Sequence, residues 1–322
     1  MFKFNQLDKK LLFELSQNSR QPETSLAKKL KVSKDVIRYR MNKLEQAGVI
    51  TNYNIWIDVA KLGYQSAKIY FHLANKPKRK QEFIEYINSD KRLFWLGIAE
   101  GAWNAGLTYF VKSNAEFFEI KNKIIEEFHD IIIDTKTASL VSVNWCERHY
   151  FTSTVLIEWN TIFDKTEFIE LDEMSKHILK ELHQNARIRM STIAEKYHTT
   201  IDIVRKRMRS MEKQGIIGRY TIGIDHTKLE YEFYKTFCYF KRLSEKDQRR
   251  FMEFIRHIPQ VIHAVIQISP WDIELETMAK SYEEYHQILG KITEEFADII
   301  HRTETAIMRE DYVFPAKKMI FE

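Results

Sequence analysis

Cationic, amide and phenolic side chains gather on one face of a predicted helix at two places in the sequence. At about 100° per residue, with Ile37 at the centre of the buried face, Met41 and Leu44 fall within roughly 40° of it. Arg can hydrogen-bond guanine O6 and N7 together, Asn can pair with adenine, and Lys can hold phosphate. The pattern predicts two helices that read the major groove of double-stranded DNA. Their exposed faces comprise Asp35, Arg38, Tyr39, Asn42 and Gln46, and Asp202, Arg205, Lys206, Arg209 and Lys213.

The alternative interpretation is a charged face that meets only solvent. The distribution of charge favours a polyanionic ligand: residues 1–64 hold 12 Lys and Arg against 6 Asp and Glu, and residues 171–231 hold 12 against 8, although the whole chain carries only +5. Two separate positive regions are typical of a protein that contacts a polyanion twice. The predicted DNA-binding residues are Ser33, Lys34, Asp35, Arg38, Tyr39, Arg40, Asn42, Lys43, Thr200, Asp202, Arg205, Lys206, Arg207, Arg209, Lys213 and Arg219.

The composition argues against several classes of enzyme. Glycine is scarce, at 9 of 322 residues, and neither G-x-G-x-x-G nor G-x-x-x-x-G-K-[ST] occurs, so nucleotide-binding loops are not expected. The 11 histidines show no metal-binding spacing, and Cys146 and Cys238 alone cannot form a zinc cluster. We therefore expect no catalytic residue, no metal, no cofactor and no enzymatic activity.

Cysteine content and hydropathy also predict a location. Two cysteines fit a reducing compartment, no apolar run approaches about 18 residues, and residues 1–6 lack the apolar core of a signal peptide. We expect a cytoplasmic protein with no membrane partner.

The elements that would position these residues occur twice. Residues 4–73 align without a gap with residues 171–240 and are identical at 24 of 70 positions. The match resumes at a shift of 168, with pairs such as Trp103 and Trp271. The chain is therefore two copies of one unit, called copy one and copy two below, joined by residues 145–170.

The first part of each copy is predicted to be three short helices followed by a β segment. In copy one, apolar residues recur at helical spacing over 7–15 and 26–30, and Ser33 is a good N-cap for the third helix. Gly48 ends that helix, and the branched and aromatic residues of 49–57 suit a short β-hairpin.

The second part of each copy reads β-α-β-β-α-β, the order of a ferredoxin-like sandwich. The expected fold class is α+β, with two winged helix-turn-helix domains and two ferredoxin-like domains. The predicted elements are 66–73, 80–89, 93–100, 105–112, 115–128 and 131–143 in copy one, and 235–241, 245–257, 261–268, 273–279, 282–296 and 299–308 in copy two. The predicted domains are 1–64 and 171–231 (helix-turn-helix), 65–144 and 232–322 (ferredoxin-like), and the connector 145–170.

A resemblance to a known family rests on several motifs of copy one. They are Asn18-Ser19-Arg20, Leu26-Ala27, Val32-Ser33, Arg38-x-Arg40-Met41-x-Lys43-Leu44-Glu45-x-x-Gly48-Val49-Ile50 and Asp58-x-x-Lys61-Leu62-Gly63. These segments resemble the N-terminal domain of Lrp/AsnC-type regulators, which pair a helix-turn-helix with a ferredoxin-like RAM domain that dimerises and often senses amino acids. Copy two departs from the pattern at Glu230, where copy one has Gly63, and over 197–200, before its recognition helix.

The resemblance also implies an effector pocket beside the turn after the second RAM strand, where the family has a Gly and a downstream Asp. Copy one has Asn104 in place of the Asp, and copy two has Ser269 in place of the Gly. Because Asp272 could hold an ammonium group and Asn104 lacks the charge, an amino acid should bind copy two better than copy one. Packing of the two tryptophans within the sheets and binding of another small molecule are the alternatives. The candidate effector-binding residues are Gly101, Trp103, Asn104, Ser269, Trp271 and Asp272.

Siroheme decarboxylases resemble the same architecture and give an enzymatic alternative. They place an Arg- and His-rich stretch between the second and third RAM strands. Here only His263 falls near such a position, and Gln267 stands where a basic residue would help. A RAM-type ligand sensor that does not bind DNA is a third possibility, but it would not need basic recognition helices.

The duplication predicts how the domains associate. Two RAM sheets that pack face to face could do so within one chain, which would make the molecule a covalent pseudo-dimer; exchange of domains between chains is the competing arrangement. Further homo-oligomerisation through the RAM domains is also possible on the family's pattern. Because Tyr39 and Asn42 of one helix correspond to Lys206 and Arg209 of the other, the two DNA half-sites should differ.

Overall fold

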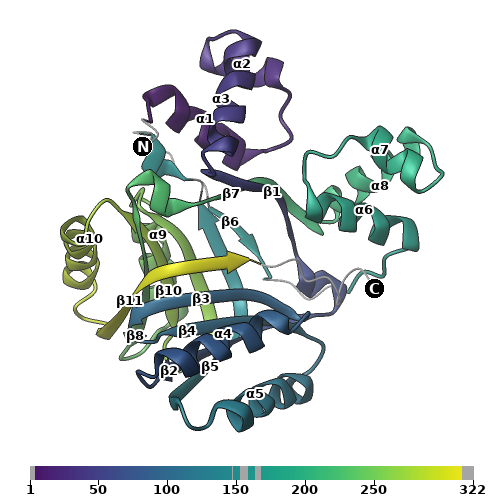
Figure 1. The fold of residues 1–322 in the computed structure, drawn as a ribbon. Coiled ribbons are helices and arrows are strands. Elements are labelled where there is room, and N and C mark those ends of the chain that lie inside the picture. The colour runs from purple at the N-terminus through teal and green to yellow at the C-terminus, as the bar shows by residue number, and fades with distance from the viewer. Residues whose placement is uncertain (1–3, 147, 153–158, 164–167, 314–322) are drawn as a thin grey trace. The chain divides into compact units, whose positions relative to one another are not determined.

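The computed structural model describes residues 4–146, 148–152, 159–163 and 168–313 (Figure 1). The chain divides into two compact units, which are described separately. The first unit comprises Met1–Asp58, Cys146–Trp159 and Leu171–Glu232, and the second comprises Val59–Trp145, Asn160–Glu170 and Phe233–Glu322. Each unit thus contains a part of both copies. The predicted domain boundaries stay predictions.

The first unit holds two sets of three helices and one strand from each copy. Polar side chains begin the helices: Ser33, the predicted N-cap, and Asn5 accept hydrogen bonds from backbone amides in copy one, as Asp172 and Thr200 do in copy two. The elements are α1 (Gln6–Gln17), α2 (Glu23–Leu30), α3 (Lys34–Gln46), β1 (Ile50–Ile57), α6 (Glu173–Gln184), α7 (Met190–Lys196), α8 (Ile201–Lys213) and β7 (Ile217–Ile224). Between them lies the short 3-10 helix η2 (His149–Phe151).

The β-hairpin predicted over 49–57 is wrong. Residues 50–57 form the single strand β1, which pairs antiparallel with β7 of copy two. The segment has no two-residue hairpin turn such as Asn-Gly or Asp-Gly, so the strand continues and pairs with a strand of the other copy. Asn54 and Thr221, which hold the same position in the two copies, lie opposite each other. A pseudo-twofold axis therefore passes between them.

The second unit contains two β-α-β-β-α-β sets, which confirms the predicted α+β class. Copy one supplies β2 (Gln65–Leu73), α4 (Pro77–Ser89), β3 (Leu93–Gly101), β4 (Ala105–Val111), α5 (Asn114–Phe128) and β5 (Ile132–Cys146). Copy two supplies β8 (Glu232–Phe240), α9 (Glu245–Ile255), β9 (Val261–Ile268), β10 (Ile273–Ala279), α10 (Tyr282–Glu295) and β11 (Ile300–Val313). Shorter elements are η1 (Val59–Leu62), η3 (His226–Leu229), which belongs to the first unit, and β6 (Trp159–Ile162).

Two long strands join the sheets of the two copies. The first half of β5 pairs with β2, and its second half pairs with β9. In the same way, β11 pairs with β8 and then with β3. The order β2-β4-β3-β11-β8-β10-β9-β5, with β5 also bonded to β2, makes a closed ring of hydrogen-bonded strands. Within this chain, therefore, the last strand of each copy, β5 or β11, also pairs with the sheet of the other copy.

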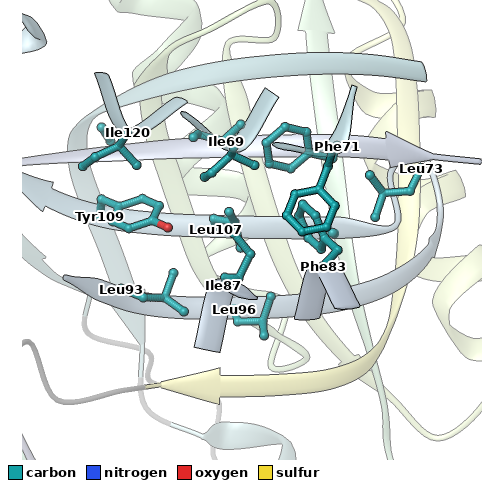
Figure 2. Close-up of a cluster of buried hydrophobic side chains, with 14 of the residues drawn as sticks. Ile69, Phe71, Leu73, Phe83, Ile87, Leu93, Leu96, Leu107, Tyr109 and Ile120 are labelled. Carbon is teal, nitrogen blue, oxygen red and sulfur yellow. The ribbon is translucent and has the colours of Figure 1, made fainter. Parts of the chain in front are cut away.

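Each sheet is covered by its own two helices on the outside of the ring (Figure 1). Figure 2 shows the core of copy one, where Ile69, Leu107 and Tyr109 of the sheet pack against Phe83 and Ile87 of α4. All five side chains are fully buried, and burial of each apolar side chain of this size contributes roughly 1.5–3 kcal/mol to folding. Within the described ranges, no helix is long and apolar enough to cross a membrane.

Candidate functional site

The third helix of each set presents the predicted polar face outward. In α3, Ile37, Met41 and Leu44 are buried, and their equivalents Val204, Met208 and Met211 are buried in α8. All five predicted residues of the α3 face are exposed, and Tyr39 is 57% exposed. On α8, Asp202, Lys206, Arg209 and Lys213 are exposed and Arg205 is half-buried. The periodicity therefore located the free face of both helices correctly.

The outward arginines rest in weak local ion pairs. The Arg38 guanidinium lies 3.0 Å from Glu23 Oε2 and 3.8 Å from Asp35 Oδ1, and Arg205 contacts Asp202. Surface pairs of this kind contribute only about 0–1 kcal/mol. Both arginines can therefore leave their carboxylates for a phosphate or a base edge at small cost.

Arg40 and Arg207 hold the third helix to the start of the first. Arg40 Nη1 lies 3.4 Å from Asp8 Oδ2, and Asp8 is fully buried. The equivalent Arg207 lies 2.6 Å from Asp172 Oδ2, at the N-cap of α6. These contacts give both residues a structural role, and their predicted contact with DNA stays a prediction.

Copy two keeps the turn into its recognition helix despite its divergent residues. Lys31 and His198 hold the same position, and both adopt the left-handed conformation, with φ of 57° and 49°. Ser33 and Thr200 then begin α3 and α8. The departures noted over 197–200 therefore leave the entry to the helix unchanged.

The two helix-turn-helix sets are joined by the same contact made twice. Arg20 Nη1 donates to the backbone oxygens of Ala186 and, at 3.0 Å, Ile188. Its equivalent Arg187 donates to the backbone oxygens of Ser19 and, at 3.3 Å, Gln21. Each guanidinium also lies over a tyrosine of the other copy, Tyr220 at 5.5 Å and Tyr53 at 5.4 Å from the ring centroid. Burial lowers the pKa of Arg20, against attraction from Tyr220 and Glu212.

The residues predicted to bind an effector do not form one cluster. Asn104 bonds the backbone of Leu73 twice: its Oδ1 accepts from the amide at 2.7 Å, and its Nδ2 donates to the carbonyl at 3.1 Å. Asp272 Oδ2 accepts from the Phe240 amide at 2.9 Å, at the equivalent place in copy two. Asn104 and Asp272 therefore share one structural role, which is to close the end of a strand.

The other candidates turn inward or approach backbone. Trp103 and Trp271 are each 1% exposed, and both rings contact Tyr70, at centroid distances of 5.1 and 5.3 Å. Gly101 has a φ of +118°, and a Cβ there would meet the Thr305 carbonyl oxygen at 2.3 Å, so only glycine fits. Ser269 donates to the backbone oxygen of Trp271.

A cavity of about 200 Å³ lies on the helix-covered side of copy one's sheet. Its floor is apolar and its rim is charged: Arg309, from β11 of copy two, lies 2.8 Å from Glu100 Oε2. The cavity is lined by Leu73, Lys80, Phe83, Ile84, Ile98, Ala99, Glu100, Asn104 and Arg309. Only Asn104 of the predicted effector residues lines it. The cavity was missed because Lys80 and Arg309 lie far from the turn in sequence.

Relatives of known class share this architecture. The family model for winged helix-turn-helix DNA-binding segments matches residues 4–51 and 171–217. The HTH-type transcriptional regulator LrpA of Pyrococcus abyssi is 40% identical over 118 residues, which cover 36% of this chain and 83% of LrpA. The chain belongs to the Lrp/AsnC family.

Other comparisons extend and limit this assignment. LrpB of Bacillus subtilis is 38% identical over 65 residues, which cover 20% of this chain and only 44% of that regulator. The solved structure of the siroheme decarboxylase NirDL superposes with a TM-score of 0.64 at 14% identity and covers 95% of this chain and 92% of NirDL. That likeness shows that a fold like that of this Lrp/AsnC protein also occurs in an enzyme.

A buried ion network, which the sequence did not predict, crosses between the two RAM sheets. Glu274 on β10 is fully buried; Lys68 Nζ and Lys235 Nζ each lie 2.9 Å from its carboxylate, and Tyr70 donates to it at 2.8 Å. Burial alone would raise the pKa of Glu274, but the two lysines outweigh it and hold the pKa below its usual range. Isolated Lys and Glu residues in strands gave no signal, because Lys68 and Lys235 lie 206 and 39 residues from Glu274 in the sequence. Nowhere in the described part of the chain do three His, Cys, Asp or Glu side chains gather as metal ligands would.

Proposed function

We propose that this Lrp/AsnC protein is a sequence-specific DNA-binding transcriptional regulator in which one chain acts as a pseudo-dimer. The observation that carries the proposal is the pair of recognition helices, α3 and α8, whose exposed faces are rich in Arg and Lys. The reciprocal contacts of Arg20 and Arg187 relate the two helix-turn-helix sets by a pseudo-twofold axis, which suits two half-sites one helical turn, or a small multiple, apart.

The half-sites are expected to differ in sequence. Tyr39 and Asn42 on α3 face outward where α8 presents Lys206 and Arg209. Asn suits adenine and Arg suits guanine, so the two copies should prefer different bases. Unbiased selection of DNA from a random pool tests this, and a strictly palindromic site would contradict it.

Gel-shift titrations over a salt series test DNA binding. Affinity should fall steeply with salt, because bound lysines and arginines release counterions from the phosphates. Arg38→Ala and Arg205→Ala should each weaken binding by about 1–3 kcal/mol and relax one base preference. Arg249→Ala on α9 is the matched control, since its side chain is 74% exposed and pairs only locally with Glu245. Binding to no duplex, or equal losses in all three variants, would refute the proposal.

An effector site is proposed at the copy-one cavity. Glu100 supplies an anion, Lys80 and Arg309 supply cations, and Phe83, Ile84 and Ile98 supply apolar floor. That combination suits an amino acid with an apolar side chain. The Lys80 backbone amide donates to the Lys76 carbonyl, but among the residues that the structure describes its Nζ has no hydrogen-bond or ion-pair partner, so the charge is free for a carboxylate.

Copy two lacks the charged rim. Gln248, Ile268 and Val141 hold the positions of Lys80, Glu100 and Arg309. The proposal therefore puts the site in copy one, opposite to the preference that Asp272 suggested. Thermal-shift screening with the twenty amino acids should find apolar ones that raise the melting temperature. Lys80→Ala should abolish that shift, whereas Arg249→Ala should keep it; a shift that survives Lys80→Ala would refute this site.

A siroheme-decarboxylase-like enzyme is the second candidate, favoured by the fold shared with NirDL, which has also been solved with an iron-uroporphyrin III analogue. Against it, His263 contacts Glu276 and the lysines between the sheets are neutralised by acids, which leaves little positive charge for a polycarboxylate. Absorbance titration with siroheme separates the candidates: tight binding and loss of carbon dioxide would favour the enzyme.

A further inference from the structure

Where the two RAM sheets contact each other, copy one and copy two contribute side chains of different charge. Lys136 on β5 and Glu304 on β11 hold the same position in their copies, 168 residues apart, yet Lys136 Nζ lies 3.0 Å from Glu304 Oε2. Each side chain is about one-quarter exposed. Two equivalent positions that touch must lie beside the pseudo-twofold axis, and here one is a cation and the other an anion.

The buried network repeats this division of charge. Lys68 and Lys235 are equivalent, and both copies keep the lysine. Glu274 and Glu276 come from copy two alone, since the equivalent positions of copy one are Gly106 and Thr108. Lys235 binds both carboxylates, and Lys68 reaches Glu274 from the facing sheet.

Copy one fills the same space with an aromatic ring. The Trp95 indole lies over Gly97 and Gly106, where a Cβ would meet it at 2.3 and 2.8 Å. Lys235 Nζ of copy two lies 4.5 Å from the centroid of that ring, close enough for cation–π attraction. Position 263, equivalent to Trp95, is a histidine that contacts Glu276. The two inner faces are therefore complementary and not alike.

Pairing of like copies would lose the contacts that join the two copies, which are Lys136 with Glu304, Lys68 with Glu274 and Lys235 with Trp95. Two copy-one sheets would bring together two Lys68, two Lys136 and no inner carboxylate, and two copy-two sheets would face Glu304 with Glu304. Buried charges without partners and like charges in contact are strongly unfavourable in an interface. The Arg20 and Arg187 contacts of the first unit show no such bias, because the two residues make the same contact from either side.

We propose that these charges are a pairing code that allows a copy-one RAM domain to pair only with a copy-two RAM domain. The partner that this surface fits is a domain with Glu274, Glu276 and Glu304 on its inner face. Such a domain is present in the same chain and in any second chain that exchanges with it. The code excludes assemblies in which equal RAM domains face each other across this sheet.

Cleavage of the intact chain tests the code. A protease site is inserted after Glu170, an exposed residue between the copies, and the cleaved protein is denatured, refolded and weighed by native mass spectrometry. Complexes of one N-terminal and one C-terminal fragment should exceed either like-with-like complex by more than about tenfold. A statistical mixture of the three complexes would overturn the proposal.

A charge-reversal cycle on the uncleaved chain needs no refolding and decides independently. Lys136→Glu and Glu304→Lys should each lower the urea midpoint, because each places like charges beside the axis. The double variant restores opposite charges and should recover more than half of the summed loss. Additive losses would show that the two residues do not recognise each other, and would overturn the proposal even where the fragments fail to refold.

Discussion

The two units join the same two copies by opposite means. In the first unit, Arg20 and Arg187 donate to backbone oxygens of the other copy, so each of these two contacts is the mirror image of the other. In the second unit, Lys136 meets Glu304, and the inner acids come from copy two alone. A contact with backbone survives divergence of sequence, since all residues have a carbonyl. A contact between side chains can diverge into a complementary pair, and here it has done so.

The largest expected change in stability is in the second unit, where the contacts between the copies are asymmetric. Glu274→Gln leaves Lys68 and Lys235 buried with one carboxylate fewer, so the second unit should lose about 3–5 kcal/mol of unfolding free energy. Urea unfolding with hydrogen exchange of β8 and β10 measures it. Lys136→Gln, at the better solvated pair, is the control and should cost less than about 1 kcal/mol. Equal costs would mean that the buried network is not special.

Acid should destabilise the first unit at a higher pH than the second. Burial lowers the pKa of His183 in α6 to about 4, so its neutral form stabilises the first unit fully above the unfolded value near 6.5. That contribution, up to about 3 kcal/mol, should be lost as pH falls from 6.5 to 4. The second unit should hold until lower pH, because the pKa values of Glu274 and Glu276 are depressed and their contribution is lost only below about 4.5.

Copy one provides the control for this pH effect. Its residue at the His183 position is Ser16, a buried hydroxyl that donates to the Phe13 carbonyl at 2.7 Å. His183→Ser should therefore flatten the stability of the first unit between pH 6.5 and 4. Hydrogen exchange of α6 at both pH values measures the change, and an unaltered pH slope in His183→Ser would assign it to another group.

The symmetric interface should respond equally from both sides. Arg20→Gln and Arg187→Gln each remove hydrogen bonds to two carbonyls and a contact with a tyrosine ring, so each should cost about 2 kcal/mol. The two losses should agree within about 0.5 kcal/mol in urea unfolding. A difference of 1.5 kcal/mol or more would break the comparison, because it would make this interface asymmetric as well.

The smallest effect concerns one residue where copy two departs from the family pattern. Glu230 adopts φ of 58°, whereas its equivalent Gly63 has φ of 81°. Glu230→Gly should raise the unfolding free energy by up to about 1 kcal/mol, since glycine enters this region without a Cβ clash. Gly63→Ala is the reverse control and should destabilise, because a Cβ there would lie 3.1 Å from Phe168. A lower melting temperature for Glu230→Gly would show that its side chain compensates for the strain.

Features that depend on neighbouring residues could be predicted from the sequence. Pairing between segments that are far apart in the sequence could not. Ser33 predicts the start of α3, and the spacing of Ile37, Met41 and Leu44 predicts its buried face, because both depend on neighbours within one or two turns. The segment 49–57 shows its β character but not its partner, which lies about 167 residues away. The same holds for the cavity, whose Arg309 rim belongs to the other copy and to a bulge between Met308 and Glu310 that no periodicity reveals.

The pairing of β11 with β3 of copy one has a consequence during synthesis on the ribosome. The edge of β3 obtains its neighbour only from residues 306–313, about 200 residues after β3 itself has been made. At a synthesis rate of about 5–20 residues per second, the backbone groups on that edge of β3 stay unpaired for roughly 10–40 s. An unpaired edge is a template for other strands, so a nascent copy one is the stage at which this protein most needs a chaperone.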